Sequence, residues 1–202
     1  CECSDIDDVI IFRKDGKYLV TRLQDKVFVG KDIIHVAVFK KKDKRTIYNM
    51  LYRDGKGGAT YVKRFNVTSV TRDREYDMTK GKKGSQVLYF SANPNGEAEV
   101  VSVYLRAVGN IKKLKFDLDF SDILIKGRNA NGNLATKHSV RTIELKEKGV
   151  STLKPRKIWF DDTVQRLNVD GRGELLGEFK GEDRLLIITQ DGVVKTITPE
   201  LT

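Results

Sequence analysis

The pattern that decides the fold is clearest at residues 185–196, which read LLIITQDGVVKT. A short apolar run is followed by Asp191-Gly192 and then by a second run that carries Lys195. An Asx-Gly pair tolerates the positive φ angles of a tight turn. The stretch therefore predicts a β-hairpin with its tip at the Asp-Gly pair.

The same turn recurs along the chain. It is found at Asp15-Gly16, Asp54-Gly55, Asn95-Gly96, Asn131-Gly132 and Asp170-Gly171 as well as at Asp191-Gly192, and the first five are 39, 41, 36 and 39 residues apart. A period near 40 residues built from hairpins is typical of radial or solenoidal β-architecture, in which each unit buries its apolar face against the next. We therefore expect an all-β fold with a hairpin tip at each of these positions.

Runs rich in Val, Ile, Tyr, Phe and Thr lie between the turns and predict strands. They cover residues 9–12, 18–23, 27–29, 33–39, 46–52, 59–67, 87–91, 98–105, 123–126, 140–145, 157–160, 163–169, 175–179, 185–189 and 193–197. Apolar residues are nowhere spaced as a helix requires over a long stretch, so helix should be scarce. The polar stretch 71–85 is interpreted as a loop between strands.

The charge balance favours a polyanionic partner. The chain of 202 residues carries 38 Lys and Arg against 28 Asp and Glu, a net charge of +10. Residues 40–83 hold 14 basic and 5 acidic residues, and residues 112–157 hold 12 and 5. Local excesses of this size in a β-protein indicate binding to a polyanion such as nucleic acid. The alternative is a charged surface that only keeps the protein in solution.

Cysteine occurs only at Cys1 and Cys3. Two cysteines cannot stabilise a fold of this length through disulfides. We therefore expect the hydrophobic core to stabilise it, as in proteins of the reducing cytosol. A structural zinc site would need four ligands, and His35 and His138 lie far away in sequence. No stretch is long and apolar enough to span a membrane. The chain lacks an initiator Met, and we expect it to be a fragment of a longer subunit forming one domain over residues 1–202.

Catalytic chemistry is hard to build from these residues. Asp117, Asp119 and Asp122 lie close together in sequence, and Asp161 adjoins Asp162. Carboxylates can act as metal ligands or as general acid and base, but here strand ends and turns are the favoured interpretation. No phosphate-binding glycine-rich loop precedes a helix, so no nucleotide cofactor is expected. The chain alone does not have the sequence features of an enzyme, and no cofactor or metal is predicted.

Basic residues recur near the predicted tips. If each repeat is a blade, these residues form a track on the outer rim that would neutralise DNA phosphates without reading the bases. The predicted DNA-binding residues, all expected to face solvent, are Lys63, Arg64, Lys126, Arg128, Lys137, Arg141, Arg172 and Lys195.

The hairpin at residues 185–196 also resembles the repeated strand-turn-strand unit of the C-terminal domain of type IIA topoisomerase A subunits. Weaker copies lie at residues 10–23, 50–65 and 123–140, and residues 170–177 resemble the second hairpin of such a blade. The resemblance implies a β-pinwheel, a propeller-like disc of about four to five blades whose rim binds and bends duplex DNA.

Two relatives within that family are distinguished by a basic box of the form Gln-Arg-Arg-Gly-Gly-Lys-Gly, which gyrase A subunits use to wrap DNA. The sequence contains no such run, and its nearest segments are 127–133 and 172–174. The resemblance therefore favours the A subunit of topoisomerase IV. It implies a non-catalytic domain that positions duplex DNA for decatenation and relaxation by a type II, ATP-dependent topoisomerase.

The partners implied are double-stranded DNA, the ATPase B subunit of the enzyme, and the rest of its A subunit, with a cytoplasmic, nucleoid-associated location and no membrane. Two alternatives remain open at this stage. One is the wrapping domain of gyrase A, and the other is a β-propeller that binds protein through its central face.

Overall fold

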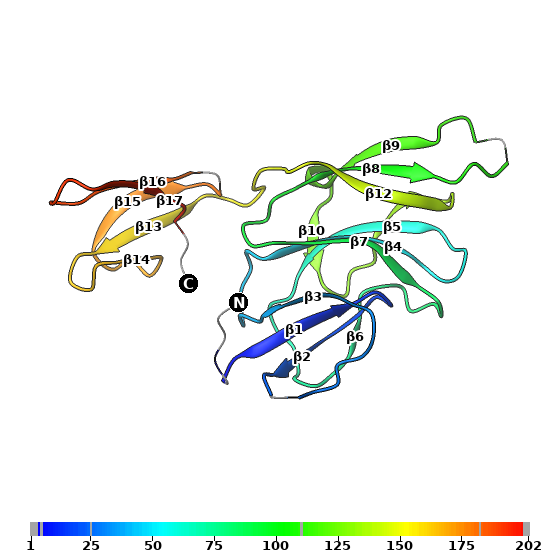
Figure 1. Ribbon diagram of the computed structural model, residues 1–202, viewed down its shortest axis with the longest axis horizontal. Helices are drawn as coiled ribbons and strands as arrows, with labels where there is room; N and C mark the ends of the chain where they lie inside the picture. The colour runs from blue at the N-terminus through cyan, green and yellow to red at the C-terminus, as the bar shows by residue number, and fades with distance from the viewer. Residues whose placement is uncertain (1–3, 5, 25, 110, 182, 200–202) are drawn as a thin grey trace.

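The computed structural model describes residues 4, 6–24, 26–109, 111–181 and 183–199. Its strands form five sheets (Figure 1), which confirms the predicted all-β fold and agrees with about four to five blades. The only helical element among the described residues is a 3-10 turn, η1 (Phe120–Asp122). Cys1 and Cys3 lie outside the described residues.

The first three sheets form the larger part of the molecule. The first has the order β3-β1-β2-β6, the second β10-β5-β4-β7 with β11 also paired to β5, and the third β12-β8-β9. Their strands are β1 (Asp8–Arg13), β2 (Lys17–Arg22), β3 (Ile33–Val38), β4 (Ile47–Arg53), β5 (Thr60–Asn66), β6 (Tyr76–Asp77), β7 (Gln86–Asn93), β8 (Val100–Leu105), β9 (Lys115–Asp119), β10 (Ile125–Gly127), β11 (Asn133–Thr136) and β12 (Val140–Glu147).

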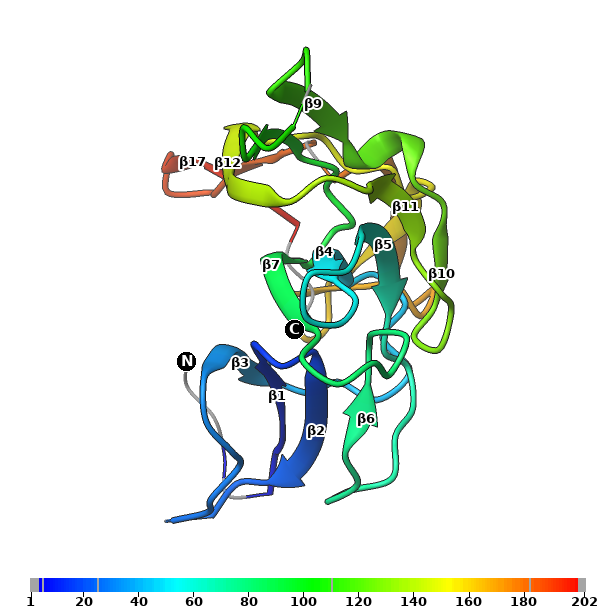
Figure 2. The ribbon, with the colours of Figure 1, turned by 90° about the vertical axis from the view of Figure 1, so that its right-hand side faces the viewer.

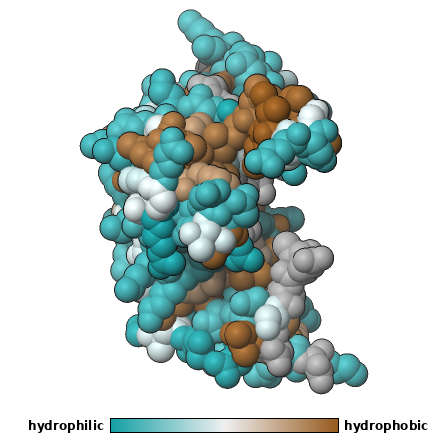
Figure 3. All heavy atoms as spheres, turned by 90° about the vertical axis from the view of Figure 1, so that its left-hand side faces the viewer, coloured by the Kyte–Doolittle hydropathy of each residue, from teal (hydrophilic) through white to brown (hydrophobic). Residues whose placement is uncertain are grey.

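The last two sheets lie to one side of the others, at the left of Figure 1. They have the orders β14-β13-β15 and β16-β17. Their strands are β13 (Arg156–Asp161), β14 (Arg166–Asn168), β15 (Glu174–Phe179), β16 (Leu185–Ile188) and β17 (Val194–Ile197). Their apolar residues remain largely exposed, including Leu186, Ile188 and Val194. Seen from this side, the molecule is hollowed between these sheets and the rest, and apolar residues gather on the overhanging part (Figure 3).

Three of the six predicted hairpin tips are confirmed. Asp15-Gly16 joins β1 to β2, the segment around Asp54-Gly55 joins β4 to β5, and Asp191-Gly192 joins β16 to β17. Gly16 and Gly192 have the positive φ angles of 84° and 81° that a tight turn of this kind requires.

The other three tips are wrong because the strands on either side of each turn do not pair with one another. Asn95-Gly96 leads from the second sheet to the third, and Asp170-Gly171 leads from one side of β13 to the other. Asn131-Gly132 connects β10 and β11, which lie along the same edge of β5, one parallel and one antiparallel. An Asx-Gly pair permits a change of direction but does not determine which strands pair. The strand predicted at residues 27–29 is also absent, and β6, β9 and β11 were missed.

Strand β4 is central to the core because both of its faces are buried. Tyr48 and Met50 belong to an apolar cluster against the first sheet, where the Phe12 ring packs at a tilt against Tyr48 with 4.6 Å between the ring centroids. Leu51 belongs to a second cluster, which includes Val101 of the third sheet. A strand covered on both faces has a nearly continuous apolar sequence. Asn49 interrupts the apolar sequence in the middle of β4, and it is fully buried.

Arg64 occupies the position on β5 opposite Asn49 and is 2% exposed. Its Nε donates to Asn49 Oδ1 at 2.9 Å, and its Nη atoms donate to the carbonyls of Gly96 and Phe120 at 3.0 and 3.3 Å. An Nη atom also donates to Thr152 Oγ1 at 3.0 Å. Arg64 therefore ties the second sheet to the third and to the segment that leads to the fourth. The prediction that Arg64 faces solvent is wrong, because its donors are used inside the fold.

Replacing Arg64 with Met should destabilise the protein by at least roughly 2–3 kcal/mol, because several buried acceptors lose their donor and each such group costs about 1–3 kcal/mol. Urea denaturation followed by circular dichroism measures the free energy of unfolding. Arg141→Met is the matched control at an exposed position and should change stability by less than about 0.5 kcal/mol. Equal stability of the two variants would contradict the role assigned to Arg64.

Candidate nucleic-acid interface

Lys63 is the second predicted rim residue that the structure buries, at 5% exposure. Its Nζ donates to the carbonyls of Met78, Arg128 and Ala130 at 2.9, 3.0 and 3.2 Å. It thus joins the β10–β11 connection to the end of β6. The predicted solvent-facing position of Lys63 is wrong, because its three ammonium donors are all occupied by backbone carbonyls.

The remaining six predicted residues are at least partly accessible, but they do not form one cluster. Lys126 and Arg128 belong to the edge of the second sheet, Lys137 and Arg141 to the beginning of β12 and the residues before it, and Arg172 and Lys195 to the last two sheets. Arg128 is held by Ser69, whose carbonyl accepts from its Nη1, and its guanidinium lies 4.3 Å from the ring centroid of Tyr76.

A basic surface that sequence reasoning missed lies where three connections meet. The loop before β7 contains Lys80-Gly81-Lys82-Lys83-Gly84, and it packs on the β4–β5 tip that carries Lys56. The Gly55 N–H donates to Ser85 Oγ at 2.9 Å, and Lys82 Nζ lies 3.4 Å from Asp54 Oδ2. A side chain at Gly84, whose φ is 83°, would place its Cβ 3.3 Å from the Lys56 backbone nitrogen. This close approach brings four lysines together.

The surface continues onto the first and third sheets. The Val87 N–H donates to the Lys14 carbonyl at 2.8 Å, which places the β1–β2 tip beside the start of β7. On the other side, Thr136 pairs with Thr60 next to the β4–β5 tip, and Lys137 follows it. Lys112 and Lys113 of the β8–β9 connection line a hollow together with Thr136 and His138.

We call this surface the rim track, and it comprises Lys14, Lys56, Lys80, Lys82, Lys83, Lys112, Lys113 and Lys137, all of them exposed. The connections that carry it lie at the right-hand edge of Figure 1 and face the viewer in Figure 2. Of the carboxylates beside it, Asp54 is buried and engaged with Ser85 and Lys82. A row of exposed lysines from three sheets forms an extended site of positive potential, suited to a polyanion.

The signal that could have identified this loop was its composition, with three lysines and two glycines in five residues. The run was missed because the polar stretch 71–85 was interpreted only as a connection between strands. Lys80 is further positioned by an aromatic contact, since its Nζ lies 3.7 Å from the ring centroid of Tyr61.

Three of the carboxylates considered for catalysis, and His35, have structural partners. Asp117 Oδ1 accepts from Ser102 Oγ at 2.7 Å, and its other oxygen lies 2.8 Å from Lys146 Nζ, which lowers the pKa of Asp117. Asp119 caps η1 and Asp161 accepts backbone N–H groups of its own turn. His35 packs against Phe12, and burial lowers its pKa.

Within the described ranges, no group of three or more His, Cys, Asp or Glu residues is arranged to hold a metal ion. Across the same residues, no helix is long and apolar enough to cross a membrane.

The fold and the rim track define a class of protein. It is an all-β domain built from small sheets, with a positively charged edge. Comparison with known families identifies it further. The family described as "Topoisomerase C-terminal domain, Bacteroidota" matches residues 2–148 and 166–202, so the chain belongs to this family. The predicted resemblance to the C-terminal domain of topoisomerase A subunits is therefore confirmed.

Two individual proteins are similar to this chain. The A subunit of DNA topoisomerase 4 from Borreliella burgdorferi is 22% identical over 141 residues, which cover 69% of this chain and 21% of that protein. The chain thus spans about a fifth of the length of this relative. The crystal structure of the C-terminal domain of DNA topoisomerase IV matches with a TM-score of 0.48 and 14% identity, covering 96% of this chain and 70% of that one.

The buried position of Lys63 gives a pH-dependent prediction. Burial lowers the pKa of Lys63 from 10.5 to about 8. In the unfolded chain the amine keeps its proton up to about pH 10.5, so between these values the unfolded state binds more protons and the contribution of Lys63 to stability rises with pH. Relative to Lys63→Met, the native protein should gain stability from about pH 8 to pH 10 and show a constant difference below about pH 7. Thermal unfolding of both proteins across this range tests it, and a difference independent of pH would contradict it.

Proposed function

We propose that this domain binds duplex DNA through the rim track and bends it, without reading base sequence, as part of a topoisomerase IV A subunit. The observation that carries the proposal is the convergence of exposed lysines from three sheets on one edge. Such an edge would neutralise successive phosphates and release counterions. Membership of the topoisomerase C-terminal domain family supports this assignment.

The domain itself would be non-catalytic, and strand breakage would belong to another part of the A subunit working with the ATPase B subunit in the cytoplasm, at the nucleoid. Its task would be to hold a duplex segment for strand passage during decatenation and relaxation. Of the residues predicted from sequence, Lys137 lies on the rim track and Arg141 follows it on β12, whereas Lys126 and Arg128 lie toward the other end of β5. Arg172 and Lys195 would form a separate contact on the last two sheets.

Removing three lysines from the rim track tests DNA binding. Lys56→Ala, Lys80→Ala and Lys83→Ala together leave the contact between Lys82 and Asp54 in place. We expect weaker binding to all duplex sequences alike. The slope of log K against log salt concentration should become less steep by about 0.9 for each lost phosphate contact. Fluorescence anisotropy over a range of salt concentrations measures both quantities.

The matched control replaces three exposed lysines away from the rim track, Lys148, Lys154 and Lys157, with Ala. This control removes the same charge and should retain most of the affinity and the slope. If both triple variants lose affinity equally, binding depends only on net charge. If neither does, the alternative of a protein-binding propeller is favoured.

The DNA topology produced by the domain separates the topoisomerase IV assignment from gyrase-type wrapping. Smooth bending of a 20–30 bp site costs roughly 1–6 kcal/mol, which rim contacts must offset. We expect modest bending and little constrained writhe when a closed circle is relaxed with excess domain and then deproteinised. A large positive linking-number shift for each bound domain would favour gyrase-type wrapping, with the loop at residues 80–84 as its basic segment.

A further inference from the structure

Strand β3 is an apolar edge strand. Its sequence, IIHVAV, contains no Lys, Arg, Asp, Glu or Pro, and in the described part of the chain it pairs only with β1. Ile33 and Val36 are 46% and 52% exposed. Natural proteins protect exposed edge strands with charges, prolines or covering segments, since an unprotected edge is a template for another strand.

The hydrogen-bonding pattern shows which groups of β3 are free. The Phe39 N–H donates to the Asp8 carbonyl at 2.7 Å, and hydrogen-bonded pairs alternate along an antiparallel ladder. Ala37, opposite Ile10, therefore directs its polar groups toward β1. The N–H and C=O groups of Val36 and Val38 point away from β1, toward the open edge.

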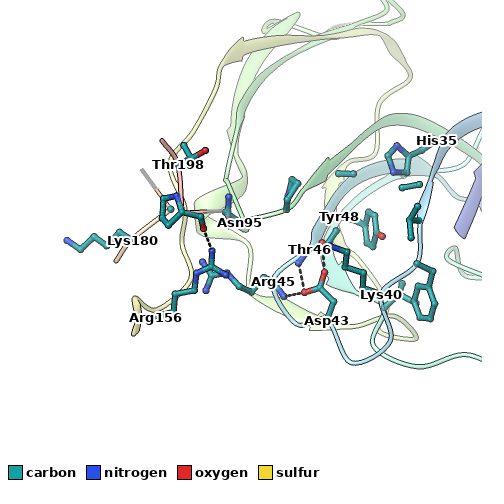
Figure 4. A pocket seen from close by; sticks show the side chains of 18 residues that line it. His35, Lys40, Asp43, Arg45, Thr46, Tyr48, Asn95, Arg156, Lys180 and Thr198 are labelled. Carbon is teal, nitrogen blue, oxygen red and sulfur yellow. Dashed lines mark hydrogen bonds between the residues drawn. The ribbon is translucent and has the colours of Figure 1, made fainter. Parts of the chain in front are cut away.

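A cavity of about 660 Å³ adjoins this strand, between β3, β4, the end of β7 and the residues flanking the last two sheets (Figure 4). Apolar residues such as Val38, Phe39 and Val67 line part of it, and Lys40, Arg45, Arg156 and Lys180 bring four positive charges to it. Among the residues that the structure describes, its one lining carboxylate is Asp43, which already accepts from the Arg45 and Thr46 N–H groups and from Thr46 Oγ1.

The two guanidinium groups in this cavity lack carboxylate partners among the described residues. Arg156 Nη2 donates to the Pro199 carbonyl at 2.6 Å, and Arg45 Nε is buried and has no hydrogen-bond partner in the described part of the chain. Burial, together with the nearby charge of Arg45, lowers the pKa of Arg156. Guanidinium groups in such surroundings are best satisfied by carboxylate or phosphate oxygens, which they bind in a bidentate manner.

We propose that β3 and this cavity bind an extended peptide segment of a protein partner, with apolar side chains and carboxylates in alternation. The peptide backbone would add to the free edge of β3, as in other cases of strand addition. Its apolar side chains, on one face of the added strand, would cover Val36 and Val38, while its carboxylates, on the opposite face, would meet Arg45 and Arg156 in the cavity.

Two other occupants fit less well. A DNA backbone would leave the apolar wall and the edge of β3 uncovered, and the rim track lies at the opposite end of β4, about 20 Å away for a strand of this length. A second copy of the chain, with a net charge of +10, would bring its own Lys40 and Arg45 against those of the first.

The probe is a fluorescein-labelled, capped octapeptide of alternating Asp and Val, and its control has Asn in place of Asp. Anisotropy should show at least roughly tenfold tighter binding of the Asp peptide. The double variant Arg45→Gln, Arg156→Gln should abolish this preference while leaving duplex DNA binding unchanged. Equal binding of the two peptides to the native protein, or displacement of the peptide by duplex DNA, would overturn the proposal.

Backbone addition is tested separately by Val36→Pro, which removes one outward N–H, with Val36→Thr as the control that keeps it. The Pro variant should bind the Asp peptide roughly tenfold more weakly than the Thr variant. Amide hydrogen exchange on the native protein provides a readout without mutation. The peptide should slow exchange at Val36 and Val38 but not at Ala37, and unchanged exchange at Val36 and Val38, or self-association of the chain through β3, would refute strand addition.

Discussion

The arrangement of the second and third sheets depends on the burial of one positive charge. A guanidinium removed from water destabilises a fold unless its donors find acceptors in suitable geometry. Arg64 finds them in Asn49 and in the carbonyls of Gly96 and Phe120, which belong to different parts of the chain. Asn49 in turn donates to Glu99 Oε2 at 3.0 Å, so a carboxylate lies in the same network. The second and third sheets cannot separate without exposing all of these groups together.

This constraint also positions the candidate interface. Because Arg64 and Asn49 fix the pairing of β4 with β5, the tip between these strands has a defined place. Lys63, the neighbour of Arg64, binds Met78 and Arg128 on the other face of β5 and thereby holds the connections beside that tip. Two basic residues that do not face solvent thus determine where the exposed lysines lie. The position of the rim track therefore depends on the buried contacts of Lys63 and Arg64.

Strand positions were predictable from sequence to the extent that they depend on local composition. The runs at 9–12, 46–52 and 59–67 correspond to β1, β4 and β5 because β-branched and aromatic residues fit a buried pleated surface. Strand pairing was harder to predict from the sequence, since it depends on contacts between residues that lie far apart in the chain. Lys63-Arg64 was assigned to the surface because basic pairs usually face water, although its position between Val62 and Phe65, within an apolar run, was a signal for burial.

The two basic regions of the protein differ in residue type, and this difference bears on what each can bind. The rim track consists of lysines on exposed connections, and an ammonium acts as a mobile point charge that follows a phosphate backbone in any register. The cavity beside β3 has Arg45 and Arg156 against apolar walls. A guanidinium is planar and favours a fixed pair of oxygens, and the low polarity around it makes the match more selective. One end of β4 is therefore suited to sequence-independent contact with DNA, and the other to a single peptide segment of defined pattern.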